Sequence, residues 1–543
     1  MYITLCNAYK VLVINPKMGY SHMNFMGRLA DTIAEAGHEV VTLQPVMDGS
    51  LASNGTTKSR LIQRGPFADM ARPTNSDDMK LVWTSGAKNP IGLVMFVPMI
   101  SNFAVKTLSH LLDDKPLLEQ LKAEQFDVAI TELFDFIGIG VLNAVGVKNI
   151  IGAHSSVIIE GTALAIGVPV IPSFMPASFS VTDDSTDLWT RATNLVFTGA
   201  SLYFQKGIAS AIDRLLKEKL GSNAIPIWMS KKGRQILLQD TVSNMSWVVD
   251  NAEPLLDFER PTLHKVVHVG GLSVHKPKPL NKVFCLLFLC IFLNLILYTI
   301  QEWDDILNRR PHTVLISFGS VARSALMPDL MKKTVLDIIK SYPNITFIWK
   351  YEEPDDKMFK GIENVIPTKW MPQGDLLADN RLTLFVTHGG VNSMMETATL
   401  GKPVITIPLF ADQSKNAKLM QKYGFGIIVE KTELLGGNRL HEAIDRVIKD
   451  KKYQTSATRI SRLLARRPFS PEDKLVKTVE LAAEFGNIPE LKAAGRNLSF
   501  FVYYNIDLIV ILSVVFLSVF GLILYIILRV CRLCFSSKKQ KKQ

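Results

Sequence analysis

The fold is decided by the stretch Leu382-Thr-Leu-Phe-Val-Thr387-His388-Gly389-Gly390-Val-Asn392-Ser393-Met-Met-Glu396, which passes from a short apolar segment into a longer amphipathic one. Leu382–Thr387 is predicted to be a strand, and Val391–Leu400 is predicted to be a helix. Gly389 and Gly390 at the junction let backbone N–H groups approach an anion, which the helix dipole also favours. The stretch therefore predicts one strand–helix unit of a parallel sheet, with an anion site at the end of the strand.

Both halves of the chain repeat this alternation of strand and helix. The first half has the strand-like segments Lys10–Asn15, Glu39–Leu43 and Phe126–Thr131 and the helix-like segment His22–Ala36, which Gly37 ends as a C-cap. The second half adds strands at Thr313–Ser317, Thr346–Trp349 and Pro403–Ile407 and a helix at Pro328–Ser341. This order favours the α/β class with two doubly wound parallel sheets. Two such sheets facing each other would enclose a cleft at the carboxyl ends of their strands.

Composition excludes several classes of function. The 543 residues, 48% hydrophobic and 20% charged, allow two or three globular domains with an apolar surplus. The net charge of +11 comes largely from the tail 529–543, and no basic stripe with interleaved aromatics occurs, so nucleic-acid binding is not expected. Neither half has Gly-x-Gly-x-x-Gly after its first strand, which argues against a nicotinamide enzyme. Apart from Cys6 near the N-terminus, the presumed catalytic domains contain no cysteine, so we expect neither a structural disulfide nor a cysteine-based metal site.

The apolar run from Leu508 to Leu528 is predicted to be a transmembrane helix. It carries no charge, and at about 1.5 Å per residue a helix of this length just crosses a hydrocarbon core of about 30 Å. Tyr503 and Tyr504, in a membrane-proximal segment 486–507, precede it like an interfacial belt, and the basic tail 529–543 follows it. The positive-inside rule places this tail in the cytosol and the body of the chain on the other side of the membrane.

Three further features bear on location. Lys539 and Lys541 resemble the dilysine retrieval signal of endoplasmic-reticulum membrane proteins, with a plain stop-transfer cluster as the alternative. Sequons, which agree with a luminal body, begin at Asn54, Asn244, Asn344 and Asn497. A luminal body also requires a signal peptide, for which Met1 to Ala8 is too short, so we expect a truncated N-terminus. The expected arrangement is a single-pass protein of the endoplasmic-reticulum membrane with a luminal catalytic body and a cytosolic C-terminus.

A second uncharged run, 283–301, fills most of the linker 281–301. As a membrane helix it would put the two halves of the chain on opposite faces of the membrane, where a site between them could not assemble. Valine codons begin with GT and a glutamine codon can be CAG, which are the bases that bound an intron. We therefore expect 283–301 to be a retained intron, whose removal joins Lys282 to Glu302 in a polar linker.

Several motifs surround the opening stretch in a fixed order. They are Ser317-Phe-Gly-Ser320, Trp370-Met-Pro-Gln373, Gly401-Lys-Pro403 and Pro408-Leu-Phe-Ala-Asp412-Gln413. Together with the opening stretch they resemble the UDP-glycosyltransferase family, in particular the membrane-bound UDP-glucuronosyltransferases, from about Lys10 to the C-terminus. The resemblance implies the GT-B fold, in which two Rossmann-like domains face each other. It divides the chain into an acceptor domain 1–280, the linker 281–301 and a donor domain 302–485.

The resemblance assigns the donor site to residues of these motifs. The residues expected to bind the UDP-sugar are Ser320, Trp370, Gln373, His388, Gly389, Gly390, Asn392, Ser393, Glu396, Asp412, Gln413 and Arg260. Trp370 offers a face on which uracil can stack, Gln373 an amide for its edge, and Glu396 a carboxylate for the ribose hydroxyls. Asp412 and Gln413 are expected to hold sugar hydroxyls, while the serine, histidine and asparagine side chains donate to phosphate. The arginine matches a family position near the linker that can reach the charge of the donor.

The catalytic residues lie in the first half. His22 follows the first strand, where the family carries its catalytic base, and the dipole of the next helix is expected to lower its pKa and keep it neutral. An aspartate at the end of a later strand usually orients this histidine in the family. Here the matching residue is Glu132, which keeps the charge but adds a methylene, and Asp135 is close enough in sequence to be a rival.

The acceptor side is the least specific part of the sequence. Pro90–Phe103 and Val168–Phe179 are rich in Met, Phe, Pro and Ile, as a pocket for small lipophilic acceptors would be, but ordinary core packing has the same composition. The expected reaction is an inverting direct displacement with UDP-sugar as co-substrate and with no cofactor or metal. A non-catalytic UDP-sugar or lipophile-binding protein of the same fold is the alternative. Glucuronate or glucose as the donor sugar, and a homo-oligomeric state, are left open.

Overall fold

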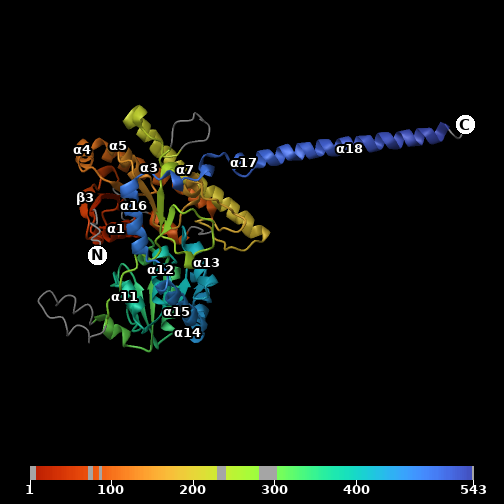
Figure 1. Cartoon of the computed structure of the whole chain (residues 1–543). Coiled ribbons are helices and arrows are strands. Elements are labelled where there is room, and N and C mark those ends of the chain that lie inside the picture. Colours follow the sequence, from red (N-terminus) through yellow and green to blue (C-terminus); the bar gives the residue numbers. More distant parts are fainter. Residues whose placement is uncertain (1–7, 71–76, 85–88, 229–239, 281–301, 541–543) are drawn as a thin grey trace, which may run out of the picture.

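Two parallel β-sheets form separate lobes, and a single long helix leads away from them (Figure 1). The computed structural model describes residues 8–70, 77–84, 89–228, 240–280 and 302–540. The expected truncation at the N-terminus and the expected insert 283–301 lie outside the described residues, so both stay predictions.

The first sheet has seven strands in the order β3-β2-β1-β4-β5-β6-β7, all parallel. Its strands are β1 (Lys10–Ile14), β2 (Glu39–Pro45), β3 (Arg60–Arg64), β4 (Val128–Glu132), β5 (Ile150–His154), β6 (Trp247–Asp250) and β7 (Val266–His268). The helices of this half are α1 (Tyr20–Glu35), α2 (Asp77–Thr84), α3 (Pro90–Asp113), α4 (Lys115–Ala123), α5 (Ile137–Val145), α6 (Glu160–Ile166), α7 (Leu188–Leu220) and α8 (Thr241–Asn244). The strand order changes direction between β1 and β4, which makes that position the topological switch point.

The second sheet has six parallel strands in the order β10-β9-β8-β11-β12-β13. Its strands are β8 (His312–Ser317), β9 (Ile345–Lys350), β10 (Val365–Thr368), β11 (Leu382–Thr387), β12 (Val404–Thr406) and β13 (Gly426–Ile428). Its helices are α10 (Asp329–Lys340), α11 (Gln373–Ala378), α12 (Val391–Leu400), α13 (Gln413–Lys422), α14 (Arg439–Lys449) and α15 (Lys452–Ala465). The switch point of this sheet lies between β8 and β11.

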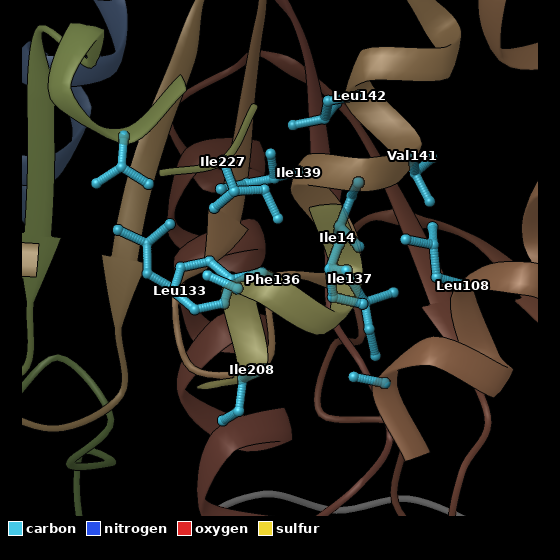
Figure 2. Packing of buried hydrophobic residues seen from close by; sticks show 14 of the residues in the cluster. Ile14, Leu108, Leu133, Phe136, Ile137, Ile139, Val141, Leu142, Ile208 and Ile227 are labelled. Atoms are coloured by element: carbon cyan, nitrogen blue, oxygen red, sulfur yellow. The ribbon is translucent and has the colours of Figure 1, made fainter. Parts of the chain in front are cut away.

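Alternation along the central strands fills a separate core on each face of the first sheet. Leu12 and Ile14 of β1 point into one cluster, whereas Val11 and Val13 point into the opposite one. Figure 2 shows part of the first cluster, which contains Ile14, Leu108 of α3, the α5 residues Ile137, Ile139, Val141 and Leu142, and Ile208 of α7. These strands are therefore apolar on both faces, as expected for a parallel sheet covered by helices.

Each domain core also contains residues from the other part of the chain. Helix α16 (Pro471–Phe485) follows the second sheet in sequence but packs beside α1 on the first sheet, where Leu475, Val479 and Ala482 complete the cluster around Val11 (Figure 1). In the opposite direction, Trp83 of α2 is buried in the core of the second sheet and donates from its indole Nε1 to the carbonyl of Arg323. The domain ranges 1–280 and 302–485 remain predictions. Helix α16 and Trp83 each pack in the core of the domain to which those ranges do not assign them.

The predicted doubly wound α/β fold is confirmed, and the predicted elements agree with the structure to within a few residues. Leu382–Thr387 and Val391–Leu400 have the expected bounds. The expected strand Phe126–Thr131 begins later and includes Glu132, which therefore belongs to the sheet. The C-terminal α18 (Ile506–Gln540), which follows α17 (Phe500–Tyr503), contains the expected span 508–528, and its part Ile506–Arg532 is long and apolar enough to cross a membrane. Helix α3 passes the same test of length and composition.

Candidate active site

Two groups of predicted residues lie at the switch points of the two sheets. His22 is in the first turn of α1, directly after β1, and Glu132 is the last residue of the neighbouring strand β4. In the second sheet, Gly319 and Ser320 follow β8, and His388 follows the neighbouring strand β11. Both groups are thus where doubly wound sheets bind ligands, beyond the carboxyl ends of their strands.

His22 makes two polar contacts with groups of the first sheet. Its Nδ1 lies 2.6 Å from Glu132 Oε1 and 2.8 Å from Oγ of Ser155, the residue directly after β5. The backbone N–H of Ser155 also donates to Glu132 Oε1, at 3.3 Å. Glu132 is buried, while the imidazole keeps 25% of its exposed area. With Nδ1 held in this way, the other ring nitrogen, Nε2, is the one left for a substrate.

The pKa of His22 differs in direction from the expectation. Burial lowers this pKa, but the charge and hydrogen bond of Glu132 raise it by more, so it lies above the usual histidine value. Burial likewise acts to raise the pKa of Glu132, but His22 and the contact with Ser155 hold it below the usual value. The expectation that the helix dipole lowers the pKa of His22 was wrong, because a carboxylate within hydrogen-bond distance outweighs the dipole.

Asp135 contacts its own backbone turn instead of His22. Its Oδ1 accepts from the N–H of Ile137 at 2.9 Å, and its Oδ2 is buried without a hydrogen-bond partner. Burial and the charge of Glu132 raise the pKa of Asp135 to about 7. The structure therefore places Glu132, and not its rival, against the imidazole.

The beginning of α12 carries the residues expected to face phosphate. No side chain caps this helix at Gly390, so its first backbone N–H groups have no side-chain acceptor. The His388 ring is half-buried between Gly319 and Gly390, and a Cβ on either glycine would lie within 2.8 Å of a ring atom. Burial lowers the pKa of His388 to about 4, so the ring is neutral and can donate from one nitrogen. Gly389 has φ +84°, a conformation that L side chains rarely adopt.

Trp370, Gln373 and Glu396 form the expected base and ribose end of this site. The Trp370 side chain is 61% exposed, and its ring meets the Tyr20 ring edge-on at 5.7 Å and Lys350 Nζ at 5.8 Å. Gln373 Nε2 donates to Glu396 Oε2 at 2.5 Å. Burial raises the pKa of Glu396 to about 7. Hydrogen bonds donated by a ligand would therefore stabilise its charged form.

Asn392 links the two halves of the site. Its Oδ1 accepts from Ser273 Oγ at 3.1 Å and from Asn251 Nδ2 at 3.3 Å, and the same Asn251 nitrogen lies 3.0 Å from the carbonyl of Ser155. Since Ser155 contacts His22, an unbroken series of polar contacts joins the His22 pair to the first turn of α12. The two groups of predicted residues therefore share one interdomain boundary.

The remaining predicted donor residues are placed in different ways. Asp412 has a pKa raised by burial, and its charge acts on His22 across the boundary. Its neighbour Gln413 is buried, and its side-chain oxygen Oε1 accepts hydrogen bonds from the backbone N–H groups of residues 409 and 410. Ser393 is also buried, inside the first turn of α12, and Ser320 is half-buried after β8.

Arg260 belongs to a buried ion cluster between the domains. Its Nη2 lies 3.6 Å from Asp257 Oδ2, whose other oxygen lies 2.9 Å from Nζ of the fully buried Lys415. The Nε and Nη2 atoms of Arg260 are buried without a hydrogen-bond partner. Arg260 also lines a small cavity with Glu160, the helix residue Thr198 and the expected acceptor segment around Val168.

The two expected acceptor segments have different surroundings. Val168–Phe179 lines that small cavity with residues 168–170 and 175–177. Pro90–Phe103 forms the first half of α3, where Val97 and Ser101 are buried but Ile91, Met95 and Phe96 are exposed. In the described part of the chain, no group of three or more His, Cys, Asp or Glu side chains is arranged to hold a metal ion.

The sequence did not single out four residues that complete the site. Tyr20 lies two residues before His22, and Lys350 ends β9, where its Nζ donates to the carbonyl of Gly319 at 2.6 Å. Ser155 and Asn251 follow β5 and β6. All four lie at the carboxyl ends of parallel strands, so the sheet topology was the signal that could have found them.

Two facing parallel sheets with polar groups gathered at both switch points are the architecture of the GT-B fold. A family model described as "UDP-glucoronosyl and UDP-glucosyl transferase" matches residues 9–288 and 308–543. The chain belongs to this family and is a UDP-glycosyltransferase that takes a UDP-sugar as donor. The interruption of the match, 289–307, overlaps the expected insert 283–301.

Relatives and solved structures agree with this assignment. The chain is 26% identical to the putative UDP-glucuronosyltransferase ugt-48 of Caenorhabditis elegans, over 98% of this chain and 97% of the relative. It is also 26% identical to UDP-glucuronosyltransferase 1A7 of Mus musculus, over 99% and 95% of the two chains. A Polygonum tinctorium UDP-glucosyltransferase has the same fold, with a TM-score of 0.55, 16% identity and coverage of 88% and 99%. The spinosyn rhamnosyltransferase SpnG, complexed with thymidine diphosphate, has a TM-score of 0.53 at 15% identity, with coverage of 87% and 100%.

Proposed function

We propose that this UDP-glycosyltransferase moves glucuronate or glucose onto small lipophilic acceptors by inverting direct displacement, with His22 as the base. The observation that carries the proposal is the position of the His22–Glu132 pair, which polar contacts connect to the uncapped beginning of α12. A base and an anion site on opposite sides of one boundary are what the displacement of UDP requires.

In the proposed step, the acceptor hydroxyl gives its proton to His22 Nε2 while its oxygen forms a bond to the anomeric carbon. The bond from that carbon to the UDP oxygen breaks, and UDP departs with the electron pair from the opposite face. The configuration at the carbon is therefore inverted. Glu132 accepts a hydrogen bond from Nδ1–H throughout and stabilises the imidazolium that forms. Glu132 orients the imidazole in this proposal, while Asp135 acts only through its neighbouring charge.

The donor is held by the second domain in this proposal. The diphosphate lies at the first backbone N–H groups of α12, and His388, Ser320 and the side-chain nitrogen of Asn392 donate to it. The side-chain oxygen of Asn392 already accepts hydrogen bonds from the first domain. Uracil stacks on the exposed Trp370, Gln373 binds its edge, and Glu396 accepts the ribose hydroxyls. Asp412 and Gln413 hold sugar hydroxyls. The step uses no cofactor or metal ion.

The proposed location follows from the C-terminal helix. Helix α18 contains a candidate membrane span, and the basic residues that follow its apolar part favour a cytosolic tail. We place the catalytic body in the lumen of the endoplasmic reticulum, where acceptors that partition into the membrane are close by.

A two-donor assay tests the proposal. The full chain and a variant lacking 283–301 are given radiolabelled UDP-glucuronate or UDP-glucose with a panel of phenols. We expect a glycoside of inverted configuration from one donor, with the shorter variant active. If both chains bind UDP but form no product with either donor, the protein is a binding protein of the same fold. Retained configuration in the product would overturn the displacement mechanism.

A further inference from the structure

Three lysines lie on one side of α13, the helix that begins at the expected sugar-binding residue Gln413. Lys415, Lys418 and Lys422 are spaced by three and four residues, which places their side chains along a single face of the helix. Each of the three pairs with an aspartate that precedes the linker 281–301. We call these three residues the α13 lysines.

Lys415 makes the buried contact of this set. Its Nζ lies 2.9 Å from Asp257 Oδ1, and the two side chains keep 0% and 9% of their area exposed. Burial and the charge of Arg260 lower the pKa of Lys415, whereas Asp257 raises it. Leu256 and Phe258, on either side of the aspartate, pack in a core with residues of the second domain. The pair therefore ties α13 to the segment through which the chain leaves the first domain.

Lys418 and Lys422 contact two adjacent aspartates of the first domain. Lys418 Nζ lies 3.4 Å from Asp183 Oδ2, and Lys422 Nζ contacts Asp184 Oδ2. All four side chains are partly exposed, so each pair alone contributes little and is screened by salt. The two aspartates lie between the expected acceptor segment Val168–Phe179 and the beginning of α7. These pairs thus connect the acceptor side of the first domain with α13.

The beginning of α13 also contacts the donor site. The side-chain nitrogen of Asn416 donates to the carbonyl of Gly389 at 3.1 Å and to Asp412 Oδ2 at 2.8 Å. Asp412 directly precedes α13, and its charge acts on His22. Helix α13 therefore joins the residues expected to hold the donor to segments of the first domain.

We propose that the α13 lysines are positioning residues for sugar transfer. Their aspartate partners hold α13 where Asp412 and Gln413 present the donor sugar to His22. The inference rests on the proposed function and concerns side chains outside the expected donor set. A misplacement of about 1 Å between reacting groups slows a reaction up to about 10²-fold. Loss of the lysine pairs should therefore lower kcat, whereas UDP affinity should stay the same, because the expected UDP contacts lie around α12.

Charge reversal and its rescue test the exposed pairs in the full chain. Asp183→Lys with Asp184→Lys places two cations against Lys418 and Lys422. A fourfold variant that also carries Lys418→Asp and Lys422→Asp restores both pairs with exchanged signs. With the donor that the unmodified chain uses, we expect the first variant to have about tenfold lower kcat and unchanged UDP affinity by calorimetry, since each exposed pair is worth up to about fivefold. The fourfold variant should regain most of kcat.

The matched control changes the net charge by the same amount away from the boundary. Asp329→Lys with Asp337→Lys reverses two exposed carboxylates that pair with Lys332 and Lys340 within α10. This variant should keep the kcat of the unmodified chain.

Two substitutions of Lys415 test the buried pair. Lys415→Arg keeps the positive charge beside Asp257 and should keep most of kcat. Lys415→Met removes that charge and should lower kcat at least tenfold, because a buried carboxylate then loses its nearest partner. UDP affinity should stay unchanged in both variants, which also shows that the second domain is folded.

Three results would overturn the inference. They are an unchanged kcat in the first charge-reversed variant, a fourfold variant that regains no activity, and a loss of UDP affinity as large as the loss of kcat. If the unmodified chain forms no glycoside from either donor, the proposed function fails and this inference fails with it. Equal kcat values in an active unmodified chain and in all variants would remove the positioning role alone.

Discussion

His22 Nδ1 and Glu132 Oε1 lie 2.6 Å apart at the switch point of the first sheet. The pair joins a partly exposed imidazole to a buried carboxylate, so the carboxylate holds one ring nitrogen and leaves the other toward the cleft. The family pattern expects an aspartate at this position, and here the longer glutamate reaches the ring from the last residue of β4. The proposed chemistry of the first domain depends on this contact.

Replacement of the base should remove transfer and keep donor binding. We expect His22→Ala to lower kcat about 10²–10⁴-fold, because a positioned base contributes an acceleration of that order. UDP affinity, measured by calorimetry, should stay unchanged, since all the expected donor residues except Arg260 lie in the second domain. His312→Ala, which alters an exposed histidine on β8, is the matched control. Full activity of His22→Ala would exclude the histidine as base.

The pH profile should report the His22–Glu132 pair. Glu132 raises the pKa of His22 above 6.5, and only the neutral ring can accept a proton. In the unmodified chain kcat/KM should therefore fall on the acid side with a midpoint above 6.5. In Glu132→Gln the midpoint should move to lower pH, and the plateau should drop by about one to two orders of magnitude. An unmoved midpoint would show that Glu132 does not control the ring.

Ser155 is expected to act as a positioning residue for His22. Its hydroxyl lies 2.8 Å from Nδ1, and its backbone N–H donates to Glu132. Loss of one hydrogen bond of about 1 kcal/mol predicts a roughly fivefold lower kcat in Ser155→Ala, with an unchanged KM for the donor and a shifted acid limb of the pH profile. Ser156→Ala, whose hydroxyl faces the carbonyl of Val157, should behave like the unmodified chain. Equal rates in both variants would contradict the assignment.

Donor binding should be coupled to the ionisation of Glu396. Burial raises its pKa to about 7, and a carboxylate that accepts ribose hydroxyls must be charged. UDP affinity should therefore rise as pH increases through 7, with protons released on binding. Calorimetry in buffers of different ionisation enthalpy measures this release. In Glu396→Gln the pH dependence should vanish and affinity should fall about ten- to hundredfold. Proton release that persists in this variant would point to another group.

A side chain added at Gly319 tests whether UDP binding depends on the position of the His388 ring. Its φ is +81°, and an added Cβ would lie 2.8 Å from His388 Cε1. We expect Gly319→Ala to displace the imidazole and weaken UDP binding about tenfold, since one charge-assisted hydrogen bond is disturbed. Gly361→Ala is the matched control, because Gly361 has φ +80° with nothing within 4 Å of the added Cβ. If both variants lose UDP affinity equally, backbone strain and not the ring would be the cause.

The sequence predicted the sheets better than the long helices and the contacts between the domains. Strands such as β8 and β11 have short apolar centres, Val314–Ile316 and Leu384–Val386, so their positions could be read locally. The bounds of helix α7 could not, because the polar residues Asn194, Ser201 and Gln205 interrupt the apolar stripe on its buried side. Gln205 is satisfied only by partners far away in the chain, among them Thr162.

The sequence predicted the site residues that belong to a recognisable motif or strand end. His22, Glu132 and His388 each end or follow a recognisable strand. Ser155 and Asn251 lie after strands that no motif marks, and their contacts with His22 and Asn392 exist only once two sheets are folded and docked. The direction of the His22 pKa was missed for the same reason, because the dipole is a local property and the carboxylate contact is not.

Helix α16 has a consequence for how the chain is made. The first sheet emerges from the ribosome early, but Leu475, Val479 and Ala482 are the residues that close one of its faces. Helix α1 already packs on that face, but the rest of it stays uncovered until the whole second domain has been synthesised, and only twenty residues then separate Phe485 from the beginning of α18. Completion of the first sheet's core and synthesis of α18 are thus late, nearly simultaneous events, so a nascent chain that stops short of α16 leaves part of an apolar sheet face open to chaperones and to aggregation.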